Sequence, residues 1–157
     1  MTGKVAPAGS AAESGAAAWG ALLRARAAVV RVLERELEQS ADMSLAWYDV
    51  LQELDSAPGH RLRMQELGER AVLSRSRVSR VVDELGRAGL ATRERDPDDK
   101  RGSWAVLTDD GRDRLRRAAP GYLDGIARHF GDHLTDAERA AITTGLTRVL
   151  AARPTPS

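Results

Sequence analysis

Arginine and serine side chains crowd residues 74–82, a segment that carries three arginines and no acid. Ser74 is a residue type that caps helix N-termini, but the turn it would open holds Arg75 and Arg77 instead of the Asp or Glu that a helix dipole attracts. A positive first turn is destabilising unless an anion lies nearby, and a nucleic-acid phosphate would supply that anion. We therefore expect base-edge or nearby phosphate contacts from Ser76, Arg77, Ser79 and Arg80, and DNA-backbone contacts from Ser74 and Arg75.

An amphipathic helix must position these groups. Its apolar residues recur at the i, i+3, i+4, i+7 spacing of one helix face. They are Val78, Val81, Val82 and Leu85. The residues that fall on the opposite side are Ser76, Arg80, Asp83 and Arg87. An ordinary surface helix with a solvated basic face would show the same pattern, so the helix alone does not establish DNA binding.

A hairpin is expected to follow this helix. Strand-type residues occupy Ala91–Arg95 and Ser103–Leu107, and the turn formers between them leave Lys100 and Arg101 at the tip. A helix followed by a hairpin with a basic tip is the layout of a winged helix-turn-helix. In that layout the helix enters the major groove and the wing reaches toward an adjacent minor groove.

Several motifs occur in a specific order between Leu67 and Arg112. They are Leu73-Ser74 at the start of the helix, Val81-Val82-Asp83-x-Leu85 in its core, Gly89-Leu90 before the first strand, Asp96-Pro97 with Asp99-x-Arg101 at the tip, and Leu107-Thr108-x-x-Gly111-Arg112 after the second strand. This ordered set resembles the DNA-binding lobe of the MarR (multiple antibiotic resistance regulator) family. A weaker match to the flanking helices covers residues 16–150.

The resemblance implies roles for the wing residues. Arg101 would reach into the minor groove, oriented by a local ion pair with Asp99, whereas the alternative is an exposed turn with an ordinary Asp–Arg pair. Lys100 stands where many members of the family have Arg, so the tip keeps its charge and loses a fork-shaped contact. Arg93 and Arg95 are either phosphate contacts or solvated strand residues.

The resemblance also implies a homodimer on a palindromic operator, with the two recognition helices about one turn (~10 bp) apart. Small aromatic or phenolic effectors of relatives bind between the dimer helices and the DNA lobe. The aromatic residues that could line such a pocket are Trp19, Trp47, Tyr48 and Tyr122, and the alternative is that they belong to the core. We expect a ligand-responsive repressor. The alternatives are a constitutive or architectural DNA-binding protein without an effector, and a dimeric ligand- or protein-binding module that has lost DNA binding.

The expected fold is mainly α (α+β), in a single domain over residues 16–150. Its parts are dimerisation helices at 16–40 and 109–150, a winged helix-turn-helix lobe at 44–108, and disordered tails at 1–15 and 151–157. The helices expected outside the recognition helix are Ala16–Gln39, Leu45–Asp55, Met64–Ala71, one from Thr108 to about His133 and one to about Leu150, and His60–Arg63 could add a third strand to the wing. Pro120 predicts a kink or break near Ala119.

Composition excludes several classes of function. The chain has 157 residues, a formal net charge of +1 and no cysteine, which excludes disulfides, cysteine-ligated zinc and thiol-based peroxide sensing. No apolar run approaches membrane-spanning length and the N-terminus lacks a secretory signal, so we expect a soluble cytoplasmic protein. Common catalytic motifs are missing, including a phosphate-cradling glycine loop and a His–Glu zinc motif, so binding is expected and not catalysis.

Two histidines are the remaining candidates for chemistry. His129 and His133 would lie at i, i+4 on one helix, a spacing that can hold a transition metal. A third nitrogen or sulfur ligand is not evident apart from the distant His60. We therefore expect solvent-facing or hydrogen-bonded histidines near the dimer interface, and no metal or cofactor.

Overall fold

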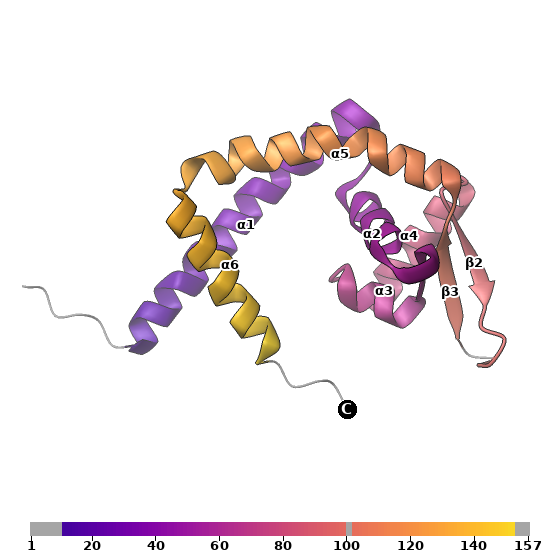
Figure 1. The fold of residues 1–157 in the computed structure, drawn as a ribbon, viewed down its shortest axis with the longest axis horizontal. Helices are drawn as coiled ribbons and strands as arrows, with labels where there is room; N and C mark the ends of the chain where they lie inside the picture. Colours follow the sequence, from indigo (N-terminus) through magenta and orange to yellow (C-terminus); the bar gives the residue numbers. More distant parts are fainter. Residues whose placement is uncertain (1–10, 100–101, 153–157) are drawn as a thin grey trace, which may run out of the picture.

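The computed structural model describes residues 11–99 and 102–152. Its helices are α1 (Ala11–Ala41), α2 (Leu45–Ser56), α3 (Met64–Arg70), α4 (Arg75–Arg87), α5 (Asp109–His129) and α6 (Asp136–Ala151). Its strands are β1 (Arg61–Arg63), β2 (Ala91–Arg95) and β3 (Ser103–Leu107), with short 3-10 helices at Pro58–His60 and Gly131–His133. Figure 1 shows α2, α3, α4 and the strands gathered in one lobe, from which α5 extends toward α1 and α6. The expected mainly α fold with a winged helix-turn-helix lobe is confirmed.

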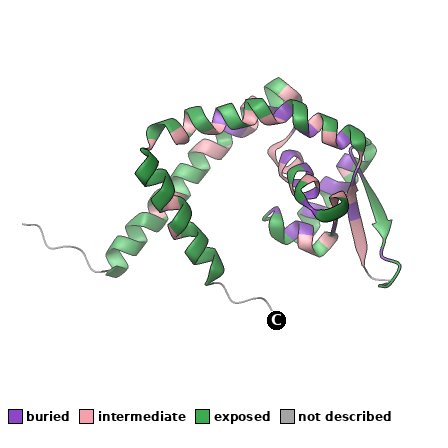
Figure 2. Ribbon diagram, in the orientation of Figure 1, coloured by how far each residue is buried: buried purple, intermediate pink, exposed green. Residues whose placement is uncertain are grey.

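The core of the lobe is aliphatic and lies where α2, α3 and α4 meet the sheet (purple in Figure 2). The buried residues of α4 are Val78, Val81, Val82 and Leu85, as the periodicity predicts. They join a cluster that includes Leu51 and Leu54 of α2 and Leu67 of α3. Burying one such side chain stabilises the fold by about 1.5–3 kcal/mol, so the core determines which face of α4 points outward.

The strands form one antiparallel sheet in the order β1-β3-β2, and β1 confirms the third strand of the wing. Residues that pair across neighbouring strands lie on the same sheet face. Arg93 pairs with Ala105, which is fully buried, and Arg95 pairs with Ser103. Arg93 and Arg95 therefore lie on the face of the sheet that covers the core.

Four helices are capped at the N-terminal end by a serine or threonine hydroxyl group that accepts a hydrogen bond from a backbone N–H. The pairs of hydroxyl and N–H are Ser44 with Trp47 (3.2 Å), Ser74 with Arg77 (3.3 Å), Thr108 with Gly111 (3.0 Å) and Thr135 with Glu138 (3.3 Å). The C-terminal end of α4 is closed by Gly89, whose φ is 74°, while the Leu90 N–H donates to the Leu85 carbonyl at 2.9 Å. This left-handed helix end favours glycine, because a side chain at that φ is strained.

Two expectations about the long helices are wrong. The first helix begins at Ala11 and not at residue 16, so residues 11–15 are helical and not part of a tail. Residues 1–10 and 153–157 lie outside the described residues. Of the kink or break expected near Ala119, the break does not occur, since α5 runs through Pro120. Leu115 and Ala118 are buried before the proline and Gly125 after it, so packing on both sides holds the helix together despite one missing N–H donor.

The terminal helices extend away from the lobe (Figure 1), and α1 and α6 are exposed over most of their length (Figure 2). No residue of α6 is buried. The large apolar residues exposed on α1, α5, α6 and the bend between α5 and α6 are Trp19, Leu23, Leu123, Phe130, Leu146, Val149 and Leu150. Within the described ranges, no helix is long and apolar enough to cross a membrane.

Candidate nucleic-acid interface

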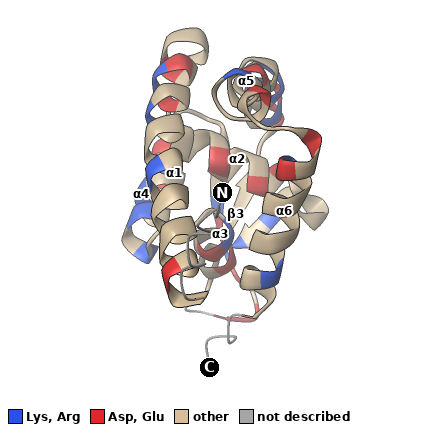
Figure 3. Cartoon of the chain, turned by 90° about the vertical axis from the view of Figure 1, so that its left-hand side faces the viewer, with Lys and Arg blue, Asp and Glu red and all other residues tan. Residues whose placement is uncertain are grey.

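The outer face of α4 carries the basic side chains that the sequence singles out, visible as blue bands in Figure 3. Arg75, Arg77 and Arg80 are exposed, and the first turn of the helix contains no acid. In the part of the chain that the structure describes, none of these three guanidinium groups is hydrogen-bonded or ion-paired to another residue. Three cations on one exposed helix face are therefore available to an external anion.

Two serines lie beside these arginines in the first turn. Ser74 and Ser76 are exposed, and their hydroxyl oxygens are 3.3 Å apart. Ser74 Oγ also accepts from the Arg77 N–H as the helix cap. The hydroxyl groups and the free backbone N–H groups of this turn can all donate hydrogen bonds to an anion at the N-terminal end of α4.

Ser79 and Arg93, both predicted as candidate DNA contacts, are hydrogen-bonded to each other. The Arg93 guanidinium donates to Ser79 Oγ at 3.0 Å and to the Ser79 carbonyl at 3.2 Å. It also lies 3.1 Å from Asp83 Oδ1. For Arg93 the sequence predicted either a phosphate contact or a solvated residue. Its contact with the recognition helix was not predicted, because the two groups are far apart in the chain.

The base of the wing is organised by Asp96, which the sequence analysis did not assign. Asp96 is 4% exposed, and its Oδ1 accepts from the Asp98 N–H at 3.0 Å. Its Oδ2 pairs with the Arg63 guanidinium of β1 at 2.8 Å. The Asp-Pro dipeptide is the signal that could have identified it, because Asp side chains commonly accept from the backbone two residues ahead in turns. Lys100 and Arg101 lie outside the described residues, and so does the predicted ion pair of Arg101 with Asp99.

A cavity of about 720 Å³ lies where the C-terminal ends of α1 and α4 approach α2 and α5. Its lining residues include Glu38, Trp47, Glu84, Leu90 and Arg114. The four aromatic residues predicted to form an effector pocket are not gathered here. Only Trp47 lines this cavity, while Trp19 is 61% exposed on α1, and Tyr48 and Tyr122 contact each other with ring centroids 4.3 Å apart.

Asp49, next to Tyr48 in the chain, is a half-buried acid in α2. Burial raises the pKa of this carboxyl to about 6, the negative charge of Glu53 adds to the rise, and Arg26 opposes it. The pKa of the Tyr122 hydroxyl is raised by burial and by the charge of Asp49. The negative charge of Asp49 thus disfavours ionisation of the Tyr122 hydroxyl.

The histidine pair does not have the predicted geometry. Helix α5 ends at His129, and His133 lies in the following 3-10 helix, so the i, i+4 arrangement on one helix is wrong. His129 Nε2 lies 2.7 Å from Glu36 Oε1 of α1, and this hydrogen bond is the main reason that the pKa of Glu36 is lowered. Among the described residues, no three His, Cys, Asp or Glu side chains form a group that could hold a metal ion.

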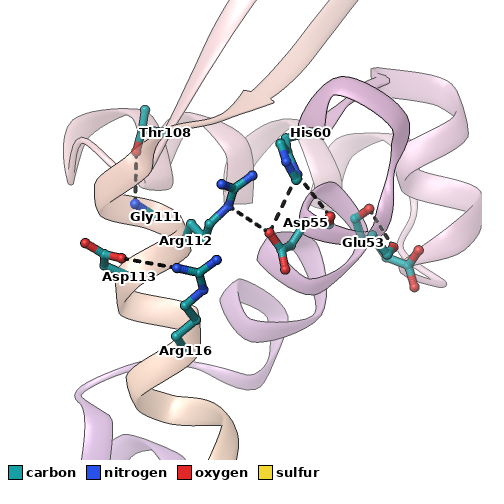
Figure 4. Close-up of polar contacts among 9 residues, drawn as sticks. Glu53, Asp55, His60, Thr108, Gly111, Arg112, Asp113 and Arg116 are labelled. Atoms are coloured by element: carbon teal, nitrogen blue, oxygen red, sulfur yellow. Dashed lines mark hydrogen bonds and ion pairs between the residues drawn. The ribbon is translucent and has the colours of Figure 1, made fainter.

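Helix α5 is joined firmly to the lobe near its N-terminus (Figure 4). Arg112 Nε donates to Asp55 Oδ1 of α2 at 3.1 Å, and His60 Nδ1 lies 3.0 Å from the Asp55 carbonyl oxygen. Gly111 is buried, and a Cβ at this position would collide with the Leu90 carbonyl oxygen. The Gly111-Arg112 motif thus combines a close backbone approach with an ion pair between α5 and the lobe.

The chain is similar to known DNA-binding regulators. A model of the MarR family matches residues 41–102. The uncharacterised HTH-type transcriptional regulator YkoM of Bacillus subtilis (strain 168) is 41% identical over 68 residues, which cover 43% of this chain and 44% of YkoM. The chain thus spans about half the length of the curated relatives it matches.

Two solved structures match over most of their length. Sco3205, a MarR family transcriptional regulator from Streptomyces coelicolor solved in complex with DNA, aligns with a TM-score of 0.80 and 35% identity over 89% of each chain. PcaV from Streptomyces coelicolor, solved with its natural ligand, aligns with a TM-score of 0.63 and 29% identity over 96% of this chain and 99% of PcaV. The winged helix-turn-helix lobe, the exposed arginines of α4 and this similarity together show that the chain belongs to the MarR family.

Proposed function

We propose that the protein is a sequence-specific DNA-binding regulator of transcription, a ligand-responsive repressor that binds a palindromic operator as a homodimer. One observation carries the proposal: α4 buries its apolar stripe and turns outward three guanidinium groups that have no partner in the described part of the chain. Its role is binding and not catalysis, and we expect it to work in the cytoplasm.

In the proposed complex, α4 lies in the major groove. Ser76, Arg77 and Arg80 contact base edges or nearby phosphates, and Ser74 and Arg75 contact the DNA backbone. Arg101 of the wing reaches into the neighbouring minor groove, oriented by Asp99. Lys100 keeps the positive charge of the tip, and Arg95 contacts phosphate. Sco3205, which is 35% identical to this chain, is solved in complex with DNA, and this supports DNA binding.

The exposed apolar side chains of the terminal helices support a dimer. Soluble monomers rarely leave such a set uncovered, and a second copy related by a two-fold axis would bury them. In the proposed dimer, residues 16–40 and 109–150 make the contacts between the two copies, and residues 44–108 form the DNA-binding lobe. Two copies of α4 would then enter successive major grooves about 10 bp apart.

The proposed effector is a small aromatic or phenolic molecule bound between the terminal helices and the lobe. The cavity beside Trp47 reaches both α5 and the recognition helix, and PcaV is solved with its natural ligand. A molecule bound there would change the spacing of the two α4 helices, so that both half-sites could no longer be engaged at once.

The proposal is tested by fluorescence anisotropy with DNA from beside the protein's own gene, at several stated salt concentrations, against unrelated DNA of equal length. We expect light scattering to show one dimer per site. We expect the affinity for the operator to exceed the affinity for unrelated DNA by about 10³-fold or more. Binding that ignores both sequence and small molecules would indicate an architectural protein. An intact dimer without affinity for DNA would indicate a ligand- or protein-binding module.

A further inference from the structure

We propose that Arg93 is a positioning residue that fastens the wing to the recognition helix, and that it does not contact phosphate. This inference rests on the proposed DNA-binding function. It concerns how the two proposed DNA-contacting elements, α4 and the β2–β3 hairpin, are held in fixed positions relative to each other.

The contacts of Arg93 span one full turn of α4. Its guanidinium reaches from β2 to Ser79 Oγ at 3.0 Å, the Ser79 carbonyl at 3.2 Å and Asp83 Oδ1 at 3.1 Å. Ser79 and Asp83 are four residues apart and so lie one above the other on the same side of the helix. One guanidinium nitrogen, Nη2, makes all three contacts.

The charge of Arg93 is already paired with an acid. Asp83 Oδ1 lies within ion-pair distance of Nη2, and the same nitrogen donates to both Ser79 oxygen atoms. Arg95 provides the contrast two residues along the same strand: it is exposed and has no hydrogen bond or ion pair to any residue in the described ranges. Arg95 therefore suits a phosphate, and Arg93 suits the helix.

The hairpin needs such a connection. Strand β2 is an edge strand that pairs with β3 alone. Strand β1 pairs with β3 no farther toward the tip than Trp104, so from Ser103 onward the wing is a two-stranded ribbon. A two-stranded ribbon is marginally stable in water on its own. The Arg93 contacts tie the middle of β2 to α4, so the wing tip and the outer face of α4 keep their relative positions before DNA arrives. Pre-ordering of this kind strengthens binding by reducing the entropy lost in the complex.

The test measures operator affinity of the dimer against salt for Arg93→Ala, Asp83→Ala, the double variant and the matched control Arg95→Ala. Arg93→Ala should weaken binding about tenfold, the change expected from one exposed ion pair lost in each of two protomers, with an unchanged salt slope. Arg95→Ala should lower the slope by about two, because each lost phosphate contact lowers it by about 0.9. In the Asp83→Ala background, Arg93→Ala should weaken operator binding little further.

A phosphate contact predicts the opposite results. Arg93→Ala would then lower the salt slope, and it would weaken binding as much in the Asp83→Ala background as in the natural protein. Asp83→Ala alone would tighten binding by removing a negative charge. Either pattern in Arg93→Ala overturns the proposal.

Hydrogen–deuterium exchange on the DNA-free dimer separates this inference from the proposed function. Exchange in β2 and β3 should rise in Arg93→Ala and Asp83→Ala but not in Arg95→Ala. Unchanged exchange in Arg93→Ala overturns the fastening role. If the natural protein binds no operator at any salt concentration, the proposed function fails, and the exchange result still decides whether Arg93 holds the wing.

Discussion

The Trp47 indole N–H of α2 donates a hydrogen bond to Glu84 Oε2 of the recognition helix, at 3.0 Å. Both residues line the cavity between the terminal helices and the lobe. The bond therefore connects the proposed effector site to the C-terminal half of α4, while Arg93 pairs with Asp83, the residue before Glu84.

Loss of the Trp47 bond should destabilise the lobe. Trp47→Phe removes the donor, and we expect the free energy of unfolding to fall by about 1 kcal/mol, the usual net value of one such hydrogen bond. Glu84→Gln keeps a carbonyl acceptor and should cost less than Glu84→Ala. Urea denaturation measures all three variants. Equal stability of Trp47→Phe and the natural protein would show that the bond contributes nothing.

Arg80→Ala should weaken operator binding by about 1–3 kcal/mol and relax sequence preference, because a guanidinium on the outer face of α4 is proposed to read a base. Competition against operators altered one base pair at a time measures the preference. Arg75→Ala is the control and should weaken binding to all sequences alike. An Arg80 variant with unchanged preference would place this residue on a phosphate.

Arg101→Ala should weaken operator binding and leave the dimer intact, since the wing tip is proposed to act on DNA alone. Anisotropy gives the affinity, and light scattering gives the mass of the particle. A variant that unfolds or dissociates would show that Arg101 has a structural role.

Gly111→Ala should be strongly destabilising. The added Cβ would meet the Leu90 carbonyl oxygen and approach Leu107 Cδ1 to 2.8 Å, so α5 would have to move off the lobe. We expect a loss of about 2–3 kcal/mol, at the upper end of overpacking effects. Gly86→Ala is a matched control in α4, where the nearest atom is at 3.8 Å, and should stabilise by up to about 1 kcal/mol through helix propensity. Thermal and urea unfolding report both.

Asp49 should make stability decrease as pH rises. Its pKa is raised from 3.8 to about 6 in the folded protein, which therefore holds the proton more tightly than the unfolded chain. The free energy of unfolding then falls from about pH 4 to about pH 6, and the cost is complete above that window. Asp49→Asn should raise the free energy of unfolding near neutral pH by about 1 kcal/mol, after allowance for partial exposure, and change little at about pH 4. Asp124→Asn, at an exposed site on α5, should show no such difference.

The amino-acid sequence determined the elements that depend on near neighbours in the chain. The apolar spacing from Val78 to Leu85 selected the buried face of α4, the hydroxyl of Ser74 capped it, and Gly89 ended it. These features follow from helix periodicity and local hydrogen bonds, which act over a few residues and can be recognised without a fold.

Tertiary structure decided what depends on residues far apart in the chain. Packing on both sides of Pro120 kept α5 continuous, and the pairing of Glu36 with His129 joined α1 to α5 where a metal-binding spacing had been considered. The distance between Arg93 and Ser79, 14 residues in the chain and 3.0 Å in space, depends on how the sheet packs against α4. Side-chain partners of this kind are set by the packing of whole elements, and no local pattern in the sequence encodes them.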